Sequence, residues 1–223
     1  LIAIAYFTIP RSEWLPIESI RIAGEFRHLD ASHLQTQLEP YLGQGFFSVD
    51  IRKIQELMRA QPWIRDASVS RVWPNQIKVS IDEKEPFARW DEQHLLSTRG
   101  QLFVADVAAF ENLPVINGYH GRSLELLDKF IQIQSKFTAK SMRITLLQED
   151  QKGSVLLEID HAFKLILGSE DEARKIAQFL EIYPQKILPE VGRIAQIDFR
   201  YSNGFAIGWK ADGKAGLSEK ELG

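Results

Sequence analysis

The side chains best suited to metal binding or general-base catalysis are five histidines, but their spacing gives them no common site. The sequence has no cysteine, which excludes disulfides, thiolate nucleophiles and cysteine-ligated metals. No two histidines stand four residues apart, the spacing that places two imidazoles on one helix face for zinc. The closest pair flanks a predicted helix cap, so we expect surface positions. The five are His28, His33, His94, His120 and His161.

The carboxylates Asp82, Glu83 and Glu85 are close enough in sequence to suggest acid/base chemistry. A catalytic carboxylate needs burial or a crowded setting to shift its pKa. These three end an alternating segment beside Lys84, which predicts a solvated strand end. The sequence also lacks a Gly-x-Ser-x-Gly nucleophile motif, and "GQG" at residues 43–45 lacks the lysine of a phosphate-binding loop. We therefore predict no catalytic centre, no metal and no cofactor.

Composition limits the class of partner. The chain has 223 residues, of which 44% are hydrophobic and 26% charged, and its net charge is -3. These values are typical of a globular protein. Because there is no excess of basic residues, nucleic acid is not expected as a partner.

The first residues, "LIAIAYFTIP", are uncharged and mostly apolar. A helix needs about 20 apolar residues to cross a bilayer, so we expect this stretch to be the exit end of a transmembrane helix that begins upstream. Tyr6 and Trp14 stand where interfacial aromatic residues would follow such an end. Residues 1–14 are thus predicted to be the helix end and a linker. A buried segment or a signal-peptide remnant is the alternative.

Residues 16–84 have the pattern of a small α/β unit. "SIRIAG" predicts a strand, and a helix follows in which Asp30 is the N-cap. A second helix begins at Ser48 or Asp50 and is stopped by Pro62. "WIRDASVSRVW" and "QIKVSIDEKE" then alternate around a turn, as in a hairpin. The predicted order is strand, helix, helix, strand, strand.

The string "PWIRDASVSRVWPNQIKVSIDEKEPFARW", after "LPIESIRIAGEF" and "GQGFFSVDI", resembles the POTRA domain of the FtsQ/DivIB family of bacterial cell-division proteins. The resemblance extends from Leu15 to Trp209. Trp73 is expected to anchor the hairpin base on the helices. Because aromatic residues at strand spacing are usually core, the predicted core aromatics are Trp63, Trp73, Phe163 and Phe199.

Beyond Trp90 the pattern predicts strands interrupted by two helices, at Ser123–Lys136 and Glu170–Tyr183. A hairpin is expected at Arg99-Gly100, and three strands in a meander between Met142 and Gly168. The resemblance implies a second, mostly antiparallel β domain. The predicted fold class is α+β, a POTRA domain (β-α-α-β-β) at 15–86 followed by a β domain with two helices at 87–210. Residues 211–223 are polar and predicted to be disordered.

The last predicted hairpin turns at Asn203-Gly204, because Asn-Gly between alternating hydrophobic residues is a strong hairpin signal. Its second arm, Phe205 to Trp209, has neither charge nor proline, although exposed edge strands usually carry them. Phe205, Ile207 and Trp209 share one face that should hold the arm to the core. We expect a partner strand to add to this edge, or else the polar tail or residues 169–183 to cover it. The predicted binding residues are Arg200, Tyr201, Ser202, Asn203, Gly204, Phe205, Ala206, Gly208 and Trp209.

The resemblance implies a non-enzymatic scaffold in the bacterial inner membrane, with most of the chain in the periplasm at the division septum. Its implied partners are the membrane-anchored coiled-coil proteins FtsB and FtsL, and through them the septal peptidoglycan synthase. It also implies a recruitment surface at Asp66, Val69 and Arg71, although Val69 could simply be core. The alternative is a POTRA chaperone of outer-membrane protein insertion, which would have tandem POTRA units or a β-barrel.

Overall fold

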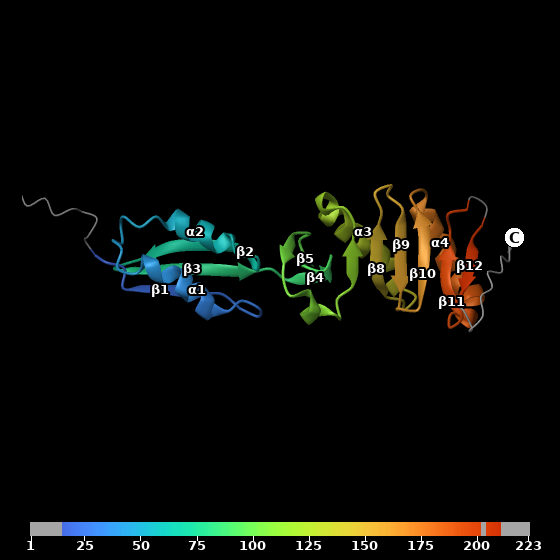
Figure 1. Cartoon of the computed structure of the whole chain (residues 1–223), viewed down its shortest axis with the longest axis horizontal. Coiled ribbons are helices and arrows are strands. Elements are labelled where there is room, and N and C mark those ends of the chain that lie inside the picture. Colours follow the sequence, from blue (N-terminus) through green and yellow to red (C-terminus); the bar gives the residue numbers. More distant parts are fainter. Residues whose placement is uncertain (1–14, 202–203, 211–223) are drawn as a thin grey trace, which may run out of the picture. The chain divides into compact units, whose positions relative to one another are not determined.

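The computed structural model describes residues 15–201 and 204–210, and the chain passes from one packed unit to a second between Glu85 and Pro86 (Figure 1). Each unit has its own cluster of buried apolar side chains, and no buried residue belongs to both clusters.

The first unit has the predicted order of strand, helix, helix, strand, strand. Its sheet has the order β1-β3-β2, in which β1 is parallel and β2 antiparallel to the central β3. The elements are β1 (Ser19–Ala23), α1 (Ala31–Leu38), η2 (Glu39–Tyr41), α2 (Ile51–Arg59), β2 (Ile64–Val72) and β3 (Gln76–Glu83).

Side-chain caps set where the two helices of this unit begin. The Asp30 carboxylate accepts a hydrogen bond from the Ser32 N–H at 2.9 Å, and Asp50 accepts one from the Arg52 N–H at 3.0 Å. Such caps satisfy backbone donors that have no partner within the helix. The Asp30 cap was predicted and is confirmed, and of the two predicted starts of the second helix, Ser48 and Asp50, the structure has Asp50 as the cap. The buried apolar residues of the two helices complete the core with β2 and β3, and they are Leu34, Leu38, Ile54 and Met58.

The prediction that Trp73 anchors the hairpin on the helices is wrong, because 78% of its surface is exposed. Trp73 follows the last residue of β2, in the turn, where the alternation of side chains between the two faces no longer applies. The core face of β3 is filled instead by Ile77, Val79 and Ile81. Trp63 is half-buried and stacks on the His28 ring with centroids 4.5 Å apart.

Glu83 is not the solvated strand end that was predicted. Its carboxylate accepts hydrogen bonds from the backbone N–H groups of Arg27 and His28, at 2.8 and 2.9 Å, and it lies 2.8 Å from the His28 ring Nδ1. These contacts attach the loop after β1 to the end of β3. Glu83 is therefore a structural acceptor, while Asp82 and Glu85 are exposed.

The second unit is one nine-stranded mixed sheet with two α-helices, in the order β12-β11-β10-β9-β8-β7-β4-β5-β6. Most neighbours are antiparallel, as predicted, and the parallel pairs are β4–β7, β7–β8 and β10–β11. The strands are β4 (Pro86–Arg89), β5 (His94–Ser97), β6 (Leu102–Val104), β7 (Val115–Asn117), β8 (Ile144–Glu149), β9 (Val155–Ile159), β10 (Phe163–Gly168), β11 (Ile194–Asp198) and β12 (Ala206–Trp209). The helices are η3 (Val107–Phe110), η4 (His120–Arg122), α3 (Ser123–Thr138), α4 (Glu172–Ile182), η5 (Tyr183–Ile187) and η6 (Leu188–Glu190).

Aromatic side chains connect the two α-helices to the sheet. Phe137 of α3 stacks on Phe179 of α4 with ring centroids 5.7 Å apart, and Phe179 also contacts Phe163 and Phe199. Phe163 and Phe199 are buried, as predicted. The position of α4 is therefore coupled to the end of β11, from which the chain enters the last strand.

Candidate partner-binding edge

The last strand, β12, is an edge of the nine-stranded sheet (Figure 1). It pairs antiparallel with β11, and among residues 15–201 and 204–210 no second strand pairs with it. A hairpin with a two-residue turn was predicted here, and its two strands pair as expected. The ladder closes at Asp198 and Ala206, so the connection spans residues 199–205 and is not the predicted two-residue turn at Asn203-Gly204.

The ladder closes early because Phe199 turns away from β12. Its N–H donates to the carbonyl of Ile166 in β10 at 2.8 Å, and its side chain is buried. Its ring also stacks on Phe205, with centroids 5.1 Å apart. Ser202 and Asn203, two of the predicted binding residues, lie outside the described residues.

The backbone of β12 alternates between its neighbour β11 and the open edge. The Lys210 N–H donates to the Arg193 carbonyl at 2.7 Å, so Lys210 faces β11. Successive residues of a strand point their backbone groups in opposite directions, and the register of β12 has no bulge on its own side. Ala206 and Gly208 therefore also face β11.

It follows that the N–H and C=O groups of Ile207 and Trp209 point to the open edge. The neighbouring strand gives the same answer independently. Because the Phe199 N–H is bonded to β10, the alternation along β11 turns Asp198 toward β12, where it pairs with Ala206.

The side chains that hold β12 to the unit are those of Phe205 and Ile207, which pack against the core as predicted. Trp209 does not join them, contrary to prediction, because it is 36% exposed and its ring lies 5.5 Å below the guanidinium carbon of Arg193.

The two predicted binding glycines, Gly204 and Gly208, differ in how much space surrounds them. A Cβ at Gly208 would lie 2.8 Å from the Gln196 side chain, whereas nothing lies within 4 Å at Gly204.

The predicted binding residues at positions 200 and 201 have different settings. Arg200 is bound to Asp198, whose carboxylate accepts hydrogen bonds from the Arg200 backbone N–H at 2.9 Å and from its guanidinium at 2.6 Å. Tyr201 is 56% exposed. Nearby, the buried Lys175 donates to the Leu167 carbonyl at 2.7 Å. The Arg200 side chain is thus held at the end of β11, whereas the Tyr201 side chain is exposed.

The Asp198 carboxyl should make this end of the sheet sensitive to acid. Burial raises its pKa, but the hydrogen bonds from Arg200 and the charges of Arg200 and Lys175 outweigh burial, so the net pKa lies below the ordinary 3.8. A depressed folded-state pKa stabilises the fold above the unfolded-state value, and this contribution is lost as pH falls through the folded-state value.

We therefore expect Asp198→Asn to lower the melting temperature at pH 7 by about 4 °C, equivalent to about 1 kcal/mol. The gap between variant and wild type should shrink as the pH is lowered through the acid range below about pH 4. Melting curves recorded across that range test this. A gap that stays constant with pH would show that the Asp198 charge does not contribute.

The family comparisons cover both units. Residues 15–84 match the family model of the POTRA domain, FtsQ-type, and residues 88–200 match that of the cell division protein FtsQ/DivIB, C-terminal. The chain belongs to the FtsQ/DivIB family of cell-division proteins.

Relatives in this family align over most of the chain. The cell division protein FtsQ of Shewanella oneidensis is 31% identical over 196 residues, which cover 87% of this chain and 74% of the relative. FtsQ of Coxiella burnetii is 28% identical over 204 residues, covering 91% and 84%. FtsQ of Xanthomonas campestris is 28% identical over 231 residues, covering 99% and 83%. The FtsQ/DivIB resemblance read from the sequence is confirmed.

The predicted recruitment surface of this FtsQ/DivIB chain lies on β2, an edge of the first sheet. Asp66 pairs with Arg59 at 2.6 Å, and Val69 is half-buried against the core. Arg71 is an exposed residue, but its guanidinium donates to the carbonyls of Phe46 and Val49, each at 2.7 Å. The three residues share a strand, and their role in recruitment stays a prediction.

Two of the five histidines meet at one carboxylate. His94 Nδ1 lies 2.9 Å from Asp91 Oδ1, and His120 Nε2 lies 3.5 Å from Asp91 Oδ2. Burial raises the pKa of Asp91, but the hydrogen bonds from the Gln93 N–H and from His94 together lower it by more than burial raises it. The net pKa is therefore below the ordinary value. Within residues 15–201 and 204–210 no three such side chains are arranged to hold a metal ion.

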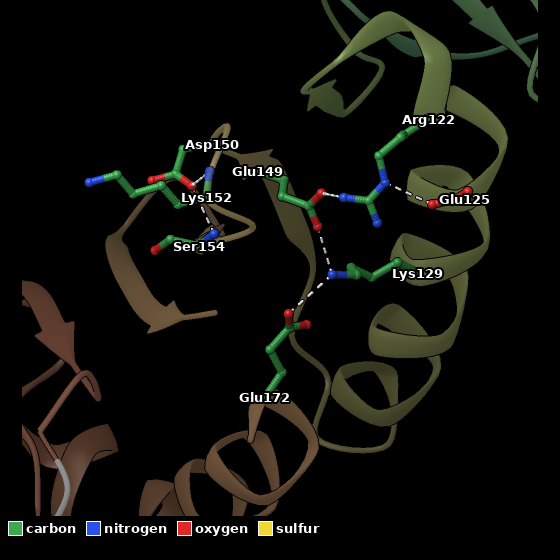
Figure 2. Close-up of polar contacts among 8 residues, drawn as sticks. All are labelled: Arg122, Glu125, Lys129, Glu149, Asp150, Lys152, Ser154 and Glu172. Carbon is green, nitrogen blue, oxygen red and sulfur yellow. Dashed lines mark hydrogen bonds and ion pairs between the residues drawn. The ribbon is translucent and has the colours of Figure 1, made fainter. Parts of the chain in front are cut away.

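A network of charges around the buried Glu149 was missed from the sequence (Figure 2). Glu149, at the end of β8, binds Arg122 and also Lys129 of α3 at 2.8 Å, while Lys129 reaches Glu172 at the start of α4 at 3.1 Å. Glu125 binds Arg122 at 2.7 Å. The network joins α3, β8 and α4, elements far apart in the sequence. No local pattern indicates it, because a glutamate ending an alternating strand normally faces solvent.

The next residues close the turn between β8 and β9. Asp150 accepts hydrogen bonds from the backbone N–H groups of Lys152 and Ser154, each at 2.8 Å (Figure 2).

In the described ranges, 15–201 and 204–210, no helix is long and apolar enough to span a membrane. The predicted membrane segment, residues 1–14, and the predicted disordered tail, residues 211–223, lie outside those ranges.

Proposed function

We propose that this FtsQ/DivIB chain is a non-enzymatic scaffold of the division machinery. It is anchored in the inner membrane by a helix that ends within residues 1–14, and residues 15–210 lie in the periplasm at the septum. It binds FtsB and FtsL, and through them it holds the septal peptidoglycan synthase. Family membership supports the role in division. It also disfavours the outer-membrane chaperone, because the family match continues through the second unit.

The observation that carries the partner-binding proposal is the open edge of β12. An extended segment of FtsB adds beside it as a further strand and bonds the outward-facing backbone of Ile207 and Trp209. The described part of the edge, Gly204 to Trp209, carries no charge or proline that would prevent this.

Backbone pairing alone gives too little affinity for a stable complex. Two outward-facing residues offer about four hydrogen bonds, each contributing about 1 kcal/mol net, and about 4 kcal/mol corresponds to a millimolar dissociation constant. Side chains beside the edge must therefore contribute. Tyr201 is the best placed, because it is an exposed aromatic residue that stands near the end of β11, and aromatic residues are enriched among binding hot spots.

We expect Tyr201→Glu to weaken binding of the FtsB periplasmic segment by about ten-fold or more, because a charge replaces an aromatic contact. The matched control is Tyr119→Glu, since Tyr119 is a tyrosine of the same unit that is 75% exposed. Titration calorimetry with the FtsB segment measures the affinities, and melting curves check folding. If the two folded variants bind the FtsB segment with equal affinity, Tyr201 does not contribute to the binding site.

A further inference from the structure

The exposed large apolar side chains of the first unit are distributed unevenly. All of those in the described part of this unit lie in three neighbouring segments, and together they are called the apolar end. The apolar end consists of Leu15, Leu42, Phe47, Val72 and Trp73. Phe47 is 66% exposed, and Trp73 more so. Large exposed apolar groups that gather in one place usually mark an interaction surface.

Hydrogen bonds join the three segments into one surface. The Phe46 N–H donates to the Leu15 carbonyl at 2.8 Å, which attaches the loop before α2 to the first described residue. The Arg71 guanidinium donates to the Phe46 carbonyl at 2.7 Å. The Glu18 N–H donates to the Asn75 carbonyl at 3.0 Å, in the β2–β3 turn. Figure 1 shows this turn and the first described residues at the same end of the unit.

The opposite end of the unit has a different character. There β3 ends at Glu83, and α2 ends beside an ion pair between Arg59 and Asp66. The tryptophan at that end, Trp63, is half-buried against His28. The exposed apolar groups are therefore a property of one end and not of the whole unit.

The sequence outside the described residues indicates what covers the apolar end. Residues 1–10 are uncharged and mostly apolar, and only residues 11–14 separate them from Leu15. The five residue steps from Pro10 to Leu15 span at most about 18 Å. If residues 1–10 leave the hydrocarbon core of a bilayer, as proposed above, the apolar end lies within or beside the headgroup layer. Tryptophan favours that layer, because its ring is apolar and its N–H is polar.

We propose that the apolar end is a lipid-binding surface, through which the first unit rests on the headgroup region of the membrane. Trp73 and Phe47 enter that region, beside the point where the chain leaves the bilayer. The first unit is then held by two attachments, the chain itself and this surface, and it does not swing freely on residues 11–14. This inference rests on the proposed membrane anchor but not on FtsB binding.

Because the sequence has no cysteine, single cysteines can carry a polarity-sensitive fluorophore in the full chain. The test positions are Trp73→Cys and Phe47→Cys, and the control is Ala60→Cys, which is exposed at the end of α2. The chain, together with the transmembrane helix expected upstream of residue 1, is reconstituted into phosphatidylethanolamine–phosphatidylglycerol vesicles with nitroxide-labelled headgroups. We expect quenching at positions 73 and 47 to be about three-fold stronger than at position 60, with emission shifted to the blue.

Three results would overturn the inference, and they can be told apart. If the chain floats with the vesicles but positions 73 and 60 are quenched equally, the anchor holds and the lipid surface is wrong. If the chain does not float, the anchor and the lipid surface are both wrong. Emission shifted to the blue without nitroxide quenching would mean that protein covers the apolar end. FtsB affinity, measured on the same proteins, tests the edge of β12 separately.

Discussion

The double variant Arg122→Leu/Lys129→Met should lose about 3 kcal/mol or more of the free energy of unfolding of the second unit. Both cations bind Glu149, whose side chain is only 4% exposed. Without them a carboxylate stays buried with no opposite charge, which is far more costly than the loss of a surface ion pair. Burial lowers the pKa of Lys129, but hydrogen bonds to Glu149 and Glu172 raise it more, so the amine stays charged.

A third substitution separates this explanation from a simple packing defect. Adding Glu149→Leu removes the buried charge, so the triple variant should be more stable than the double variant. The control is Glu125→Gln, which affects only an exposed pair and should change stability by less than about 1 kcal/mol. Urea denaturation followed by circular dichroism gives all four values. If the triple variant is less stable than the double, Glu149 does not act through its charge.

The network also bears on the proposed function. It fixes the start of α4, and α4 carries Phe179, which packs against Phe199 at the end of β11. Phe199 in turn stacks on Phe205 just before β12. The network reaches β12 only through this packing and does not contact it directly. Loss of the network should therefore weaken FtsB binding only to the extent that it unfolds the second unit.

Local signals were sufficient to predict the element order of the first unit, but in the second unit the short strands β4 and β7 were not predicted. Asp30 was recognised as a helix cap, and Asp50 as one of two possible starts of the second helix, because a cap depends on residues within one turn. The β2–β3 hairpin was recognised from alternation on both sides of a turn. The parallel pairing of β10 with β11 was not predicted, because α4 and two short helices separate these strands.

The errors occurred where contacts distant in sequence decide the outcome. Glu83 has the pattern of a solvated strand end, but it accepts hydrogen bonds from a loop more than 50 residues earlier. Asn203-Gly204 is a strong turn signal, but the Phe199 side chain is buried in the core, so strand pairing ends at Asp198 and the connection is longer than predicted. The predicted edge at β12 is found at the edge of the sheet among residues 15–201 and 204–210. The outward-facing backbone groups of β12 could be assigned only from the register between β11 and β12.

Replacing Trp209 with proline should reduce affinity for the FtsB segment by about 30-fold or more, because it removes an outward-facing N–H and puts a ring where the incoming strand would lie. Trp209→Ala keeps the N–H and removes only the partly exposed side chain and its contact with Arg193. It should therefore lose only a few-fold in affinity. Neither substitution touches the backbone bonds from Ala206 and Gly208 to β11, so both variants should melt within a few degrees of the wild type.

Ala206→Pro is the complementary variant, because its backbone faces β11 and not the open edge. It should lower the free energy of unfolding by about 3 kcal/mol, since proline breaks a bond of the internal ladder. Binding and urea unfolding measured on the three variants then distinguish the two sides of the strand. If Trp209→Pro binds FtsB as well as Trp209→Ala does, while both remain folded, the partner does not add as a strand beside β12.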